Sequence, residues 1–489
     1  FRFFPGFYHH VPDTMRRIPY EGNPNGTWDN LVPATTLRLS RAGGEDTTAP
    51  STVDPVLLNL DTLRQTLVSV LKLGTRVPPH ELTEFTQRLW VFLTSCDARR
   101  FGQWEYVSWW EFVRAHNKSE EYKKLLVRGL TRTLVAAKEE VASCRTIGYM
   151  AEAFLMTTTR RGNDGEYDRL LTAPTNEAWI DPWVALLADL GVRFRAGTVE
   201  ALDVAGGRVA AARVRDTSGS LVTVEADWYV CAMPVERAVK LWSADVLALD
   251  PALERMNELV TDWMNGIQFY LRQATPITPG HISYVDAPWA LTSISQAQFW
   301  DRRDFGRDYG DGNVCDCLSV DVSDWDTRGI VYDKPAKQCT REEIAHEVWA
   351  QLKAHLNDTG TPQLSDADLH SWFLDPAIAW SGGQNSNDEP LLINSVGSWQ
   401  KRPTARTGLP NLFLAGDYVQ TNVDLATMEG ANESARAAVN AMLHESGSQA
   451  DPVPMWTLYR PPETEALKQT DEIRYRAGLP NVFDTPPVT

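Results

Sequence analysis

The sequence predicts an α/β (α+β) protein in which two domains, one of them rich in helices, interleave along the chain. Residues 54–169 repeat apolar positions at spacings of three and four, which is typical of helices that bury one face. Residues 192–234 instead alternate apolar and polar positions between Gly-containing turns, which is typical of strands. Because helix-rich and mixed stretches alternate again up to residue 443, we expect the chain to cross repeatedly between the two domains.

The individual elements follow from the same patterns. Three helices are expected in VLLNLDTLRQTLVSVLKL, ELTEFTQRLWVFLTS and SEEYKKLLVRGLTRTLVAAKEEVAS, and a fourth in TNEAWIDPWVALLADLG, ending at Gly191. The apolar run ADWYVCAMP predicts a strand covered on both faces. An amphipathic stretch in the Pro-rich tail, ETEALKQTDEIRYRAG, is expected to lie on the outside of the fold. We assign residues 1–50, 170–243 and 401–445 to one domain, 51–169 and 244–400 to the helix-rich domain, and 446–489 to the tail.

Charge and cysteine content limit the possible partners. The formal charge of -17 argues against nucleic acid and against anionic lipid, because both require clustered Lys and Arg. No apolar run approaches the roughly 20 residues of a membrane-spanning helix. The six Cys residues follow no disulfide framework, so we expect reduced thiols in a cytoplasmic protein, with peripheral membrane contact left open. No metal site is expected, and His9 and His10 are expected at the surface.

One strand–loop–helix segment near the C-terminus suggests a ligand site. NLFLAG predicts a buried strand that ends at Gly416 and Asp417, and a helix is expected to begin near Thr427. In α/β proteins, ligands bind at the carboxyl ends of the strands. The free N–H groups of a first helical turn favour an anionic or acceptor-rich ligand. The helix also carries a face of small residues, which indicates either close approach to a ligand or tight packing: Gly430, Ser434, Ala437, Ala438 and Ala441.

The same segment resembles a known family. LFLAGDYVQTNVDLATMEGANESARAA is similar to the C-terminal FAD signature of the flavin amine oxidase and phytoene desaturase superfamily, and most to its desaturase branch. Three further stretches resemble the family's segments in the expected order: FRFFPGFYHHVPDTM, TNEAWIDPWVALLADLGVRFRAGTVEAL and ADWYVCAMPVERA. The resemblance implies an interleaved two-domain flavoprotein, with a Rossmann-like FAD-binding domain and a helix-rich substrate domain.

The resemblance also implies roles for individual residues. Asp417 would bind the ribityl or pyrophosphate part of FAD, and Gly416 would permit its close approach. Met428 would present its backbone N–H to the flavin pyrimidine oxygen. Thr427 and the rest of the first helical turn would also bind the cofactor. Val199 would contact the adenine, Pro234 would lie at the turn beside the cofactor, and residues 4–6 would border the flavin ring. In chain order these further residues are Phe4, Pro5, Gly6, Val199, Pro234, Thr427, Glu429, Gly430 and Ala431.

One departure from the family pattern is large. The family begins with a βαβ unit that carries G-x-G-x-x-G, and this sequence contains no such motif. The chain instead starts inside the apolar run FRFF, which predicts a buried strand. We therefore expect a companion polypeptide that carries the G-x-G-x-x-G unit, whether cleaved off or separately encoded.

The expected reaction follows from the position before Met428. Amine oxidases usually place an aromatic residue of the flavin cage there, whereas this chain has Thr427, which favours a bulkier apolar substrate. We predict an FAD-dependent oxidoreductase that accepts hydride from an apolar, isoprenoid- or carotenoid-like substrate in a desaturase-type reaction. Trp399, Thr427, Tyr8 and the helical block would line its pocket, and no catalytic base is assigned. Two alternatives stay open: a flavin amine or amino-acid oxidase, and a non-catalytic binding partner. Self-association is also left open.

Overall fold

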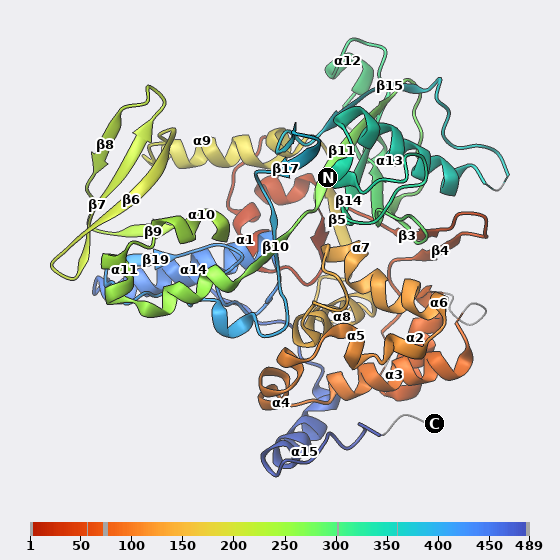
Figure 1. Ribbon diagram of the computed structural model, residues 1–489, viewed down its shortest axis with the longest axis horizontal. Coiled ribbons are helices and arrows are strands. Elements are labelled where there is room, and N and C mark those ends of the chain that lie inside the picture. The colour runs from red at the N-terminus through yellow and green to blue at the C-terminus, as the bar shows by residue number, and fades with distance from the viewer. Residues whose placement is uncertain (1–2, 56, 72–76, 301–302, 359, 486–489) are drawn as a thin grey trace.

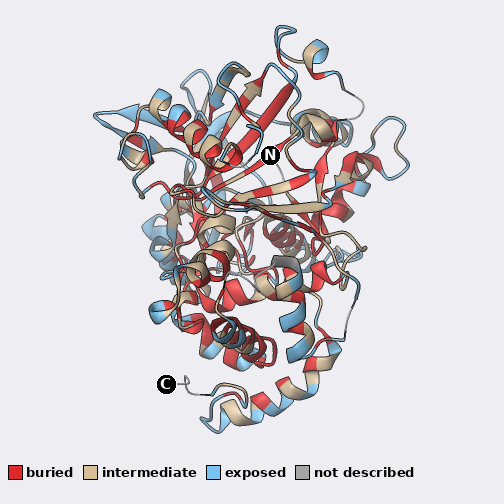
Figure 2. Cartoon of the chain, turned by 90° about the vertical axis from the view of Figure 1, so that its right-hand side faces the viewer, coloured by how far each residue is buried: buried red, intermediate tan, exposed pale blue. Residues whose placement is uncertain are grey.

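The computed structural model describes residues 3–485 except residues 56, 72–76, 301–302 and 359. Three parts surround the centre of the molecule in Figure 1: a block of helices at the lower right, a large sheet above it, and a smaller α/β part on the left. Figure 2 shows that the tail helix at the bottom is largely exposed, whereas the helices above it bury one face. The mixture of helices and sheets confirms the predicted α/β class.

The large sheet has seven strands in the order β15-β11-β14-β13-β12-β3-β4. Alternate residues of β11 are buried, and Ile267 and Phe269 pack in one cluster with Val348 and Leu352 of helix α13 (Arg341–Leu356). One face of the sheet is therefore covered by α13, and the other face points towards the helical block. The strand bounds are β3 (Thr36–Ser40), β4 (Thr47–Pro50), β11 (Asn265–Leu271), β12 (Gly280–Tyr284), β13 (Leu291–Ser295), β14 (Asp316–Val322) and β15 (Leu369–Leu374).

The helical block confirms two of the three helices expected there and corrects the third. Helices α2 (Leu60–Leu71) and α3 (Pro79–Leu93) form as predicted, followed by α4 (Asp97–Gly102) and α5 (Trp109–Phe112). The third prediction was wrong, because the stretch breaks into α6 (Glu120–Tyr122), a π turn, a 3₁₀ turn and α7 (Arg132–Val135). Gly129 weakens the helix, and the chain turns at Ala136 (φ 52°), which brings buried Glu139 to Arg128 and Arg132. Helix α8 (Cys144–Thr158) completes the block.

The smaller α/β part is built on two parallel strands, β9 (Tyr229–Cys231) and β19 (Leu412–Leu414). Beside them lie helix α14 (Met428–Glu445), a three-stranded meander and helix α9 (Asp181–Asp189). The predicted helix end is confirmed, since Gly191 follows α9 with φ 88°. The prediction that β9 is covered on both faces was wrong: Val230 is 45% exposed, because β9 pairs only with β19 among the described residues. The meander comprises β6 (Gly197–Ala205), β7 (Arg208–Asp216) and β8 (Leu221–Val224).

The first described segment joins these parts. Strand β1 (Phe4–Pro5) and strand β2 (Leu31–Pro33) both pair with β5 (Asp168–Leu171), and Phe4 is buried, as predicted from FRFF; Phe1 and Arg2 lie outside the described residues. Helix α1 (His10–Arg16) follows and packs on α14. The other short strands and α-helices are β10 (Val260–Asp262), β16 (Ile378–Ser381), β17 (Gln384–Asn387), β18 (Leu391–Ile393), α10 (Val235–Ala238), α11 (Ala244–Leu249) and α12 (Phe305–Asp308).

The tail lies on the outside of the helical block, as expected. Helix α15 (Glu465–Arg476) contacts α4, and its buried Asp471 accepts hydrogen bonds from Arg99.

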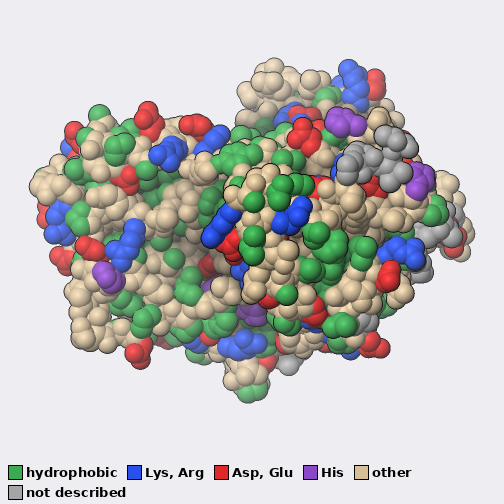
Figure 3. Space-filling view, turned by 90° about the horizontal axis from the view of Figure 1, so that it is seen from below, with side chains coloured by type: hydrophobic (Ala, Val, Ile, Leu, Met, Phe, Trp, Pro, Cys, Tyr) green, Lys and Arg blue, Asp and Glu red, His purple; other side chains and the backbone are tan. Residues whose placement is uncertain are grey.

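Among the described residues, none of the helices combines the length and the apolar character needed to span a membrane. On the face seen in Figure 3, Lys and Arg side chains are scattered among Asp and Glu side chains.

Candidate functional site

Helix α14 begins where the sequence predicts. Thr427 is its N-cap: the backbone is extended, and the side-chain oxygen accepts a hydrogen bond of 3.0 Å from the Gly430 N–H. The N–H groups of Met428 and Glu429 find no acceptor within the described part of the chain. Because Thr427 supplies one cap acceptor, two N–H groups of the first turn stay available at the electropositive end of the helix.

The small-residue face of α14 packs against the end of β19. The Gly416 N–H donates a hydrogen bond of 2.8 Å to the Ser434 hydroxyl, and Ala438 and Ala441 are buried in the same cluster as Leu414. Gly416 has φ +135°, and a Cβ there would lie 2.9 Å from the Tyr418 ring and 3.5 Å from the Met233 carbonyl. Only glycine suits this conformation and this space, so the tight-packing interpretation of the small face is correct at these positions.

Asp417 follows Gly416 and is half-buried. Burial raises the pKa of its carboxyl group, and the Arg402 guanidinium partly offsets this increase. The main-chain carbonyl of Asp417 accepts a hydrogen bond of 3.0 Å from Arg402 Nη2, while its carboxylate has no side-chain hydrogen-bond partner among the described residues. Hydrogen bonds from the main-chain N–H groups of Asp417 and Tyr418 also lower this pKa, and the carboxylate keeps further acceptor positions for a ligand at the end of the strand.

Arg402 belongs to a buried network that sequence reasoning missed. Its guanidinium pairs with Asp424, which also pairs with Arg145 Nη2 at 2.7 Å, and Arg145 pairs in turn with Glu105 at 2.8 Å. Arg402 also donates to the main-chain carbonyls of Tyr418 and of residues 417 and 419. The network thus ties the loop after Asp417 to helix α8. The separation of these residues along the chain left no local signal of their pairing.

The carboxylate of Glu429 is already occupied by the chain itself. It accepts hydrogen bonds of 2.7, 2.7 and 2.9 Å from the N–H groups of His9, His10 and Val11, and pairs with the His10 ring at 2.8 Å. Burial would raise the pKa of Glu429, but these hydrogen bonds lower it below its ordinary value. Glu429 therefore closes the N-terminal end of α1 against α14. His10 is buried, so its predicted surface position was wrong.

The segment Phe4–Tyr8 and the start of α14 enclose a small cavity of about 120 Å³. The Tyr8 hydroxyl hydrogen-bonds to Thr427, and burial raises the pKa of Tyr8 above its ordinary value. We call this the small cavity. None of the residues that line it carries a charge; they include Pro5, Phe7, Ile393, Leu425 and Ala426.

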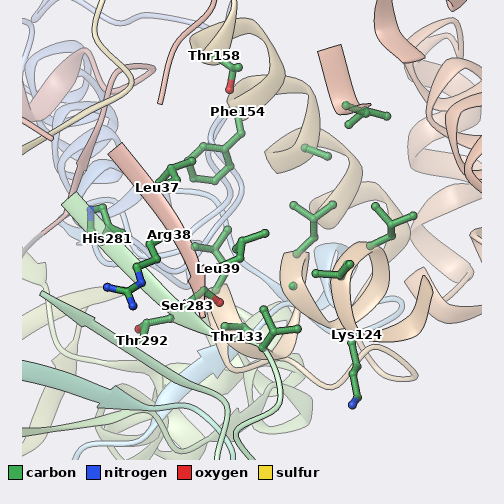
Figure 4. Close-up of a pocket in the computed structure, with 18 of the residues that line it drawn as sticks. Leu37, Arg38, Leu39, Lys124, Thr133, Phe154, Thr158, His281, Ser283 and Thr292 are labelled. Atoms are coloured by element: carbon green, nitrogen blue, oxygen red, sulfur yellow. The ribbon is translucent and has the colours of Figure 1, made fainter. Parts of the chain in front are cut away.

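A larger cavity of about 330 Å³ adjoins the small cavity (Figure 4). It lies between the helical block and the face of the seven-stranded sheet opposite α13. We call it the large cavity. The two cavities adjoin at the side chains that line both, which are Phe3, Leu134, Phe154 and Met264. The predicted role of the helical block as a pocket wall is consistent with this arrangement.

The other predicted site residues are distributed around this centre. Phe4, Pro5 and Gly6 line a cavity of about 160 Å³ on the other side of Tyr8. Pro234 follows Met233, whose carbonyl abuts Gly416, and Val199 packs in the cluster that contains Leu414. Their roles towards a cofactor stay predictions, as do those of Gly430 and Ala431.

Trp399 is not brought together with Tyr8 and Thr427. It packs on Phe101 at 5.1 Å between ring centroids, lies beneath the Arg145 guanidinium, and lines a separate cavity of about 440 Å³. Its predicted place in the substrate pocket therefore has no support from either cavity next to Thr427. No group of three or more potential metal ligands was found among the described residues.

Known proteins similar to this chain share its fold and part of its sequence. The chain is 29% identical over 245 residues to the carotenoid phi-ring synthase of Streptomyces griseus, a match that covers 47% of this chain and 42% of that protein. Its fold matches cyclohexylamine oxidase from Brevibacterium oxydans IH-35A, with a TM-score of 0.54, 11% identity, and coverage of 85% of this chain and 83% of that chain. An oxidoreductase from Methanosarcina mazei matches with a TM-score of 0.53 and 10% identity, over 90% and 87% of the two chains.

The family assignment rests on a match over most of the second half of the chain and part of the first. Residues 153–443, more than half of the chain, match the family described as flavin containing amine oxidoreductase. This region includes β9, β19, Gly416, Asp417 and the start of α14. The chain therefore belongs to the flavin-containing amine oxidoreductase family, whose members are oxidoreductases with FAD as their cofactor.

Proposed function

We propose that this chain catalyses a desaturase-type reaction, in which FAD accepts hydride from an apolar, isoprenoid- or carotenoid-like substrate. The observation that carries the proposal is the small cavity beside Thr427 and Tyr8, which has no charged lining residue and adjoins the large, mainly apolar cavity. A cationic amine would gain most from a carboxylate there, and none lines the small cavity. The likeness to a carotenoid phi-ring synthase supports the same substrate class.

The residues at the head of α14 fit the flavin end of the cofactor. Gly416 leaves no room for a side chain, the Asp417 carboxylate is available as an acceptor, and the Met428 N–H has no acceptor within the described structure. When bound there, FAD supplies the electron-pair acceptor of the reaction. The N–H groups of the first turn would stabilise the negative charge that reduction places on the flavin ring.

The remaining residues would act on the substrate by position and exclusion of water. Phe7, Ile393 and Leu425 give the small cavity apolar walls, and the Tyr8–Thr427 hydrogen bond satisfies the hydroxyl group of Tyr8. Because burial raises its pKa, Tyr8 stays protonated and neutral at physiological pH. An uncharged, dry wall favours hydride transfer from an apolar C–H group over attack by water.

Anaerobic bleaching of the flavin absorbance tests the proposal. The FAD-loaded protein is mixed without oxygen with an isoprenoid hydrocarbon or with a primary amine such as cyclohexylamine. We expect the hydrocarbon to bleach the flavin and the amine to leave the spectrum unchanged. Bleaching by the amine alone would establish the amine oxidase alternative. A protein that binds no FAD under any condition would support the non-catalytic alternative.

We further propose that a polypeptide segment with a G-x-G-x-x-G βαβ unit docks beside β9 and supplies the loop for the FAD pyrophosphate. The support is a set of exposed apolar side chains on β9, on α9 and just after α9, which we call the β9 surface: Val184, Leu190, Val192, Phe194 and Val230. Leu190 and Phe194 are 72% and 59% exposed, and residues 192–196 belong to no strand. Parallel strands are normally covered on both faces and paired at their edges, so this surface suits added parallel strands.

Co-expression with and without a G-x-G-x-x-G βαβ segment tests the docking proposal. We expect the segment to co-purify, to slow amide hydrogen exchange in residues 192–196 and 229–231, and to raise FAD content. Val230→Lys should prevent co-purification, because it places a charge on the docking edge. The matched control is Val222→Lys, at an exposed position of β8. Tight FAD binding by the chain alone, with no effect of the segment, would contradict the proposal.

A further inference from the structure

The seven-stranded sheet forms one wall of the large cavity, and this wall carries a row of polar side chains. In the strand register, Ser283 of β12 lies opposite Thr292 of β13, and Thr292 lies opposite Asp321 of β14. Residues directly opposite in neighbouring strands point to the same face, with Cβ atoms about 4.5–5.5 Å apart. All three line the large cavity, and Figure 4 shows Ser283 and Thr292 side by side.

The opposite wall of the large cavity is mainly apolar. The helical block contributes Leu and Phe side chains from several elements, and three hydroxyl groups, those of Thr66 on α2, Thr133 on α7 and Thr158 on α8. Helix α7 contacts β13, so Thr133 enters the cavity near the polar row. The apolar side chains on this wall are Leu67, Phe85, Leu89, Leu125, Leu126, Leu130, Leu134, Phe154 and Leu155. The cavity therefore has one wall for apolar groups and one that can form hydrogen bonds.

The cations and His281 of the cavity already have partners, whereas several of its hydroxyl groups, including those of Thr158 and Tyr167, have none among the described residues. Arg38 pairs with Asp46 at 2.6 Å, Lys124 with Asp286 at 2.7 Å, and His281 with Asp168. The hydroxyl groups of Ser283, Thr292 and Thr133 donate no hydrogen bond to, and accept none from, any described residue. A hydroxyl group on a cavity wall without a protein partner gains most from a ligand that completes its hydrogen bonds.

We propose that the substrate is an isoprenoid-like alcohol, whose hydroxyl group binds between Ser283 and Thr292 while its apolar chain lies against the helical wall. The proposal rests on the proposed function and adds a polar group to the substrate. A hydroxyl group can donate and accept, so it can satisfy both side chains at once. A carboxylate group fits less well, because the cations and His281 of the cavity are already engaged in ion pairs.

The specificity should therefore lie in the hydroxyl group. A hydrocarbon of the same length would fill the apolar part of the cavity but leave Ser283 and Thr292 without partners in a desolvated site. A site built to bind a substrate hydroxyl group discriminates strongly against an analogue that lacks it. Two hydrogen bonds of ordinary strength predict a preference of about 10-fold or more for the alcohol.

Calorimetric titration with farnesol and farnesene tests the inference without any turnover. We expect farnesol to bind the protein about 10-fold more tightly than farnesene. The double variant Ser283→Ala/Thr292→Val should bind both ligands with similar affinity, within about twofold of the farnesene affinity of the unchanged protein. The matched control Ser283→Thr/Thr292→Ser keeps both hydroxyl groups and should keep the preference.

Three outcomes would overturn the inference. Equal affinity of the unchanged protein for both ligands excludes a hydroxyl site, and so does a preference that survives in Ser283→Ala/Thr292→Val. Failure of both ligands to bind excludes the large cavity as their site. Thermal unfolding of both variants checks that they fold. Because flavin bleaching is measured separately, a hydrocarbon that bleaches the flavin without an alcohol preference would leave the proposed function intact and reject only this inference.

Discussion

In the large cavity, the apolar side chains of the helical block are enclosed and the charged side chains are paired, whereas around β9 apolar side chains lie open to solvent. Phe85 and Leu126 of the cavity wall are almost completely buried, but Leu190 and Phe194 of the β9 surface are 72% and 59% exposed. The difference shows that the chain itself covers the apolar groups of the proposed substrate side, whereas apolar groups of the proposed nucleotide side are open to solvent. An exposed apolar edge of this kind marks an interaction surface.

The largest effect is expected where the two sides are joined. Asp424→Ala removes the shared partner of Arg145 and Arg402, so that the buried Arg402 keeps only main-chain carbonyl acceptors and Arg145 keeps only Glu105 among the described residues. We expect the free energy of unfolding to fall by about 3–5 kcal/mol, measured by urea denaturation. Asp203→Ala, which breaks an exposed pair with Arg213, is the control and should change stability little. Equal effects of the two substitutions would mean that the junction is not held by this network.

Glu429→Gln weakens the contact between α1 and α14 and should have a smaller effect that depends on pH. Since hydrogen bonds lower the folded-state pKa of Glu429 below its ordinary value of 4.5, the charged carboxylate stabilises the fold above that pH. This stabilisation is lost as the pH falls through the lowered pKa. We expect Glu429→Gln to cost about 1.5–3 kcal/mol at pH 7.

Urea denaturation at a series of pH values checks this prediction. The stability difference between the unchanged protein and Glu429→Gln should shrink progressively below about pH 4.5, because both then carry an uncharged group. His10, which pairs with Glu429, is unchanged in both proteins and serves as a common background. A difference that stays constant down to acid pH would show that the charge of Glu429 is not what holds α1.

Thr427→Ala removes the N-cap of α14 on the nucleotide side. The Gly430 N–H loses its acceptor, and Tyr8 loses its hydrogen-bond partner. We expect a loss of about 1 kcal/mol in the free energy of unfolding. Thr427→Ser keeps the hydroxyl group and should restore most of this stability. Identical stability of the Ala and Ser variants would argue against the cap.

The smallest effect on stability is expected at the β9 surface. Phe194→Ser exchanges an exposed apolar side chain, so the free energy of unfolding should change by less than about 0.5 kcal/mol. Binding of a hydrophobic dye should decrease, as should association with the βαβ segment. Phe85→Ser, in the enclosed cavity wall, is the contrasting variant and should destabilise the protein strongly. A large stability loss for Phe194→Ser would mean that the β9 surface is already packed.

The sequence predicted most of the local structure and part of the site. The period of the apolar residues located α2, α3 and α9, and the motif after NLFLAG located Gly416 and the start of α14. It failed where the folded chain makes contacts that the local pattern does not show: the third helix of the block gives way to a turn at Ala136 that pairs Glu139 with Arg128, and Glu429 pairs with buried His10. The row of Ser283 and Thr292 could not be predicted either, because it depends on the register between strands.

The reduction potential of the bound flavin tests the central claim most directly, which is that the first turn of α14 points its N–H groups at the flavin ring. Met428→Pro removes one of these N–H groups, and proline is well tolerated at the first position of a helix. Met428→Leu keeps the N–H and is the control. We predict that Met428→Pro lowers the two-electron potential by roughly 30–60 mV, the equivalent of one hydrogen bond to a charged group, while Met428→Leu leaves it unchanged. An unchanged potential in Met428→Pro, with FAD bound as tightly as before, would contradict the claim.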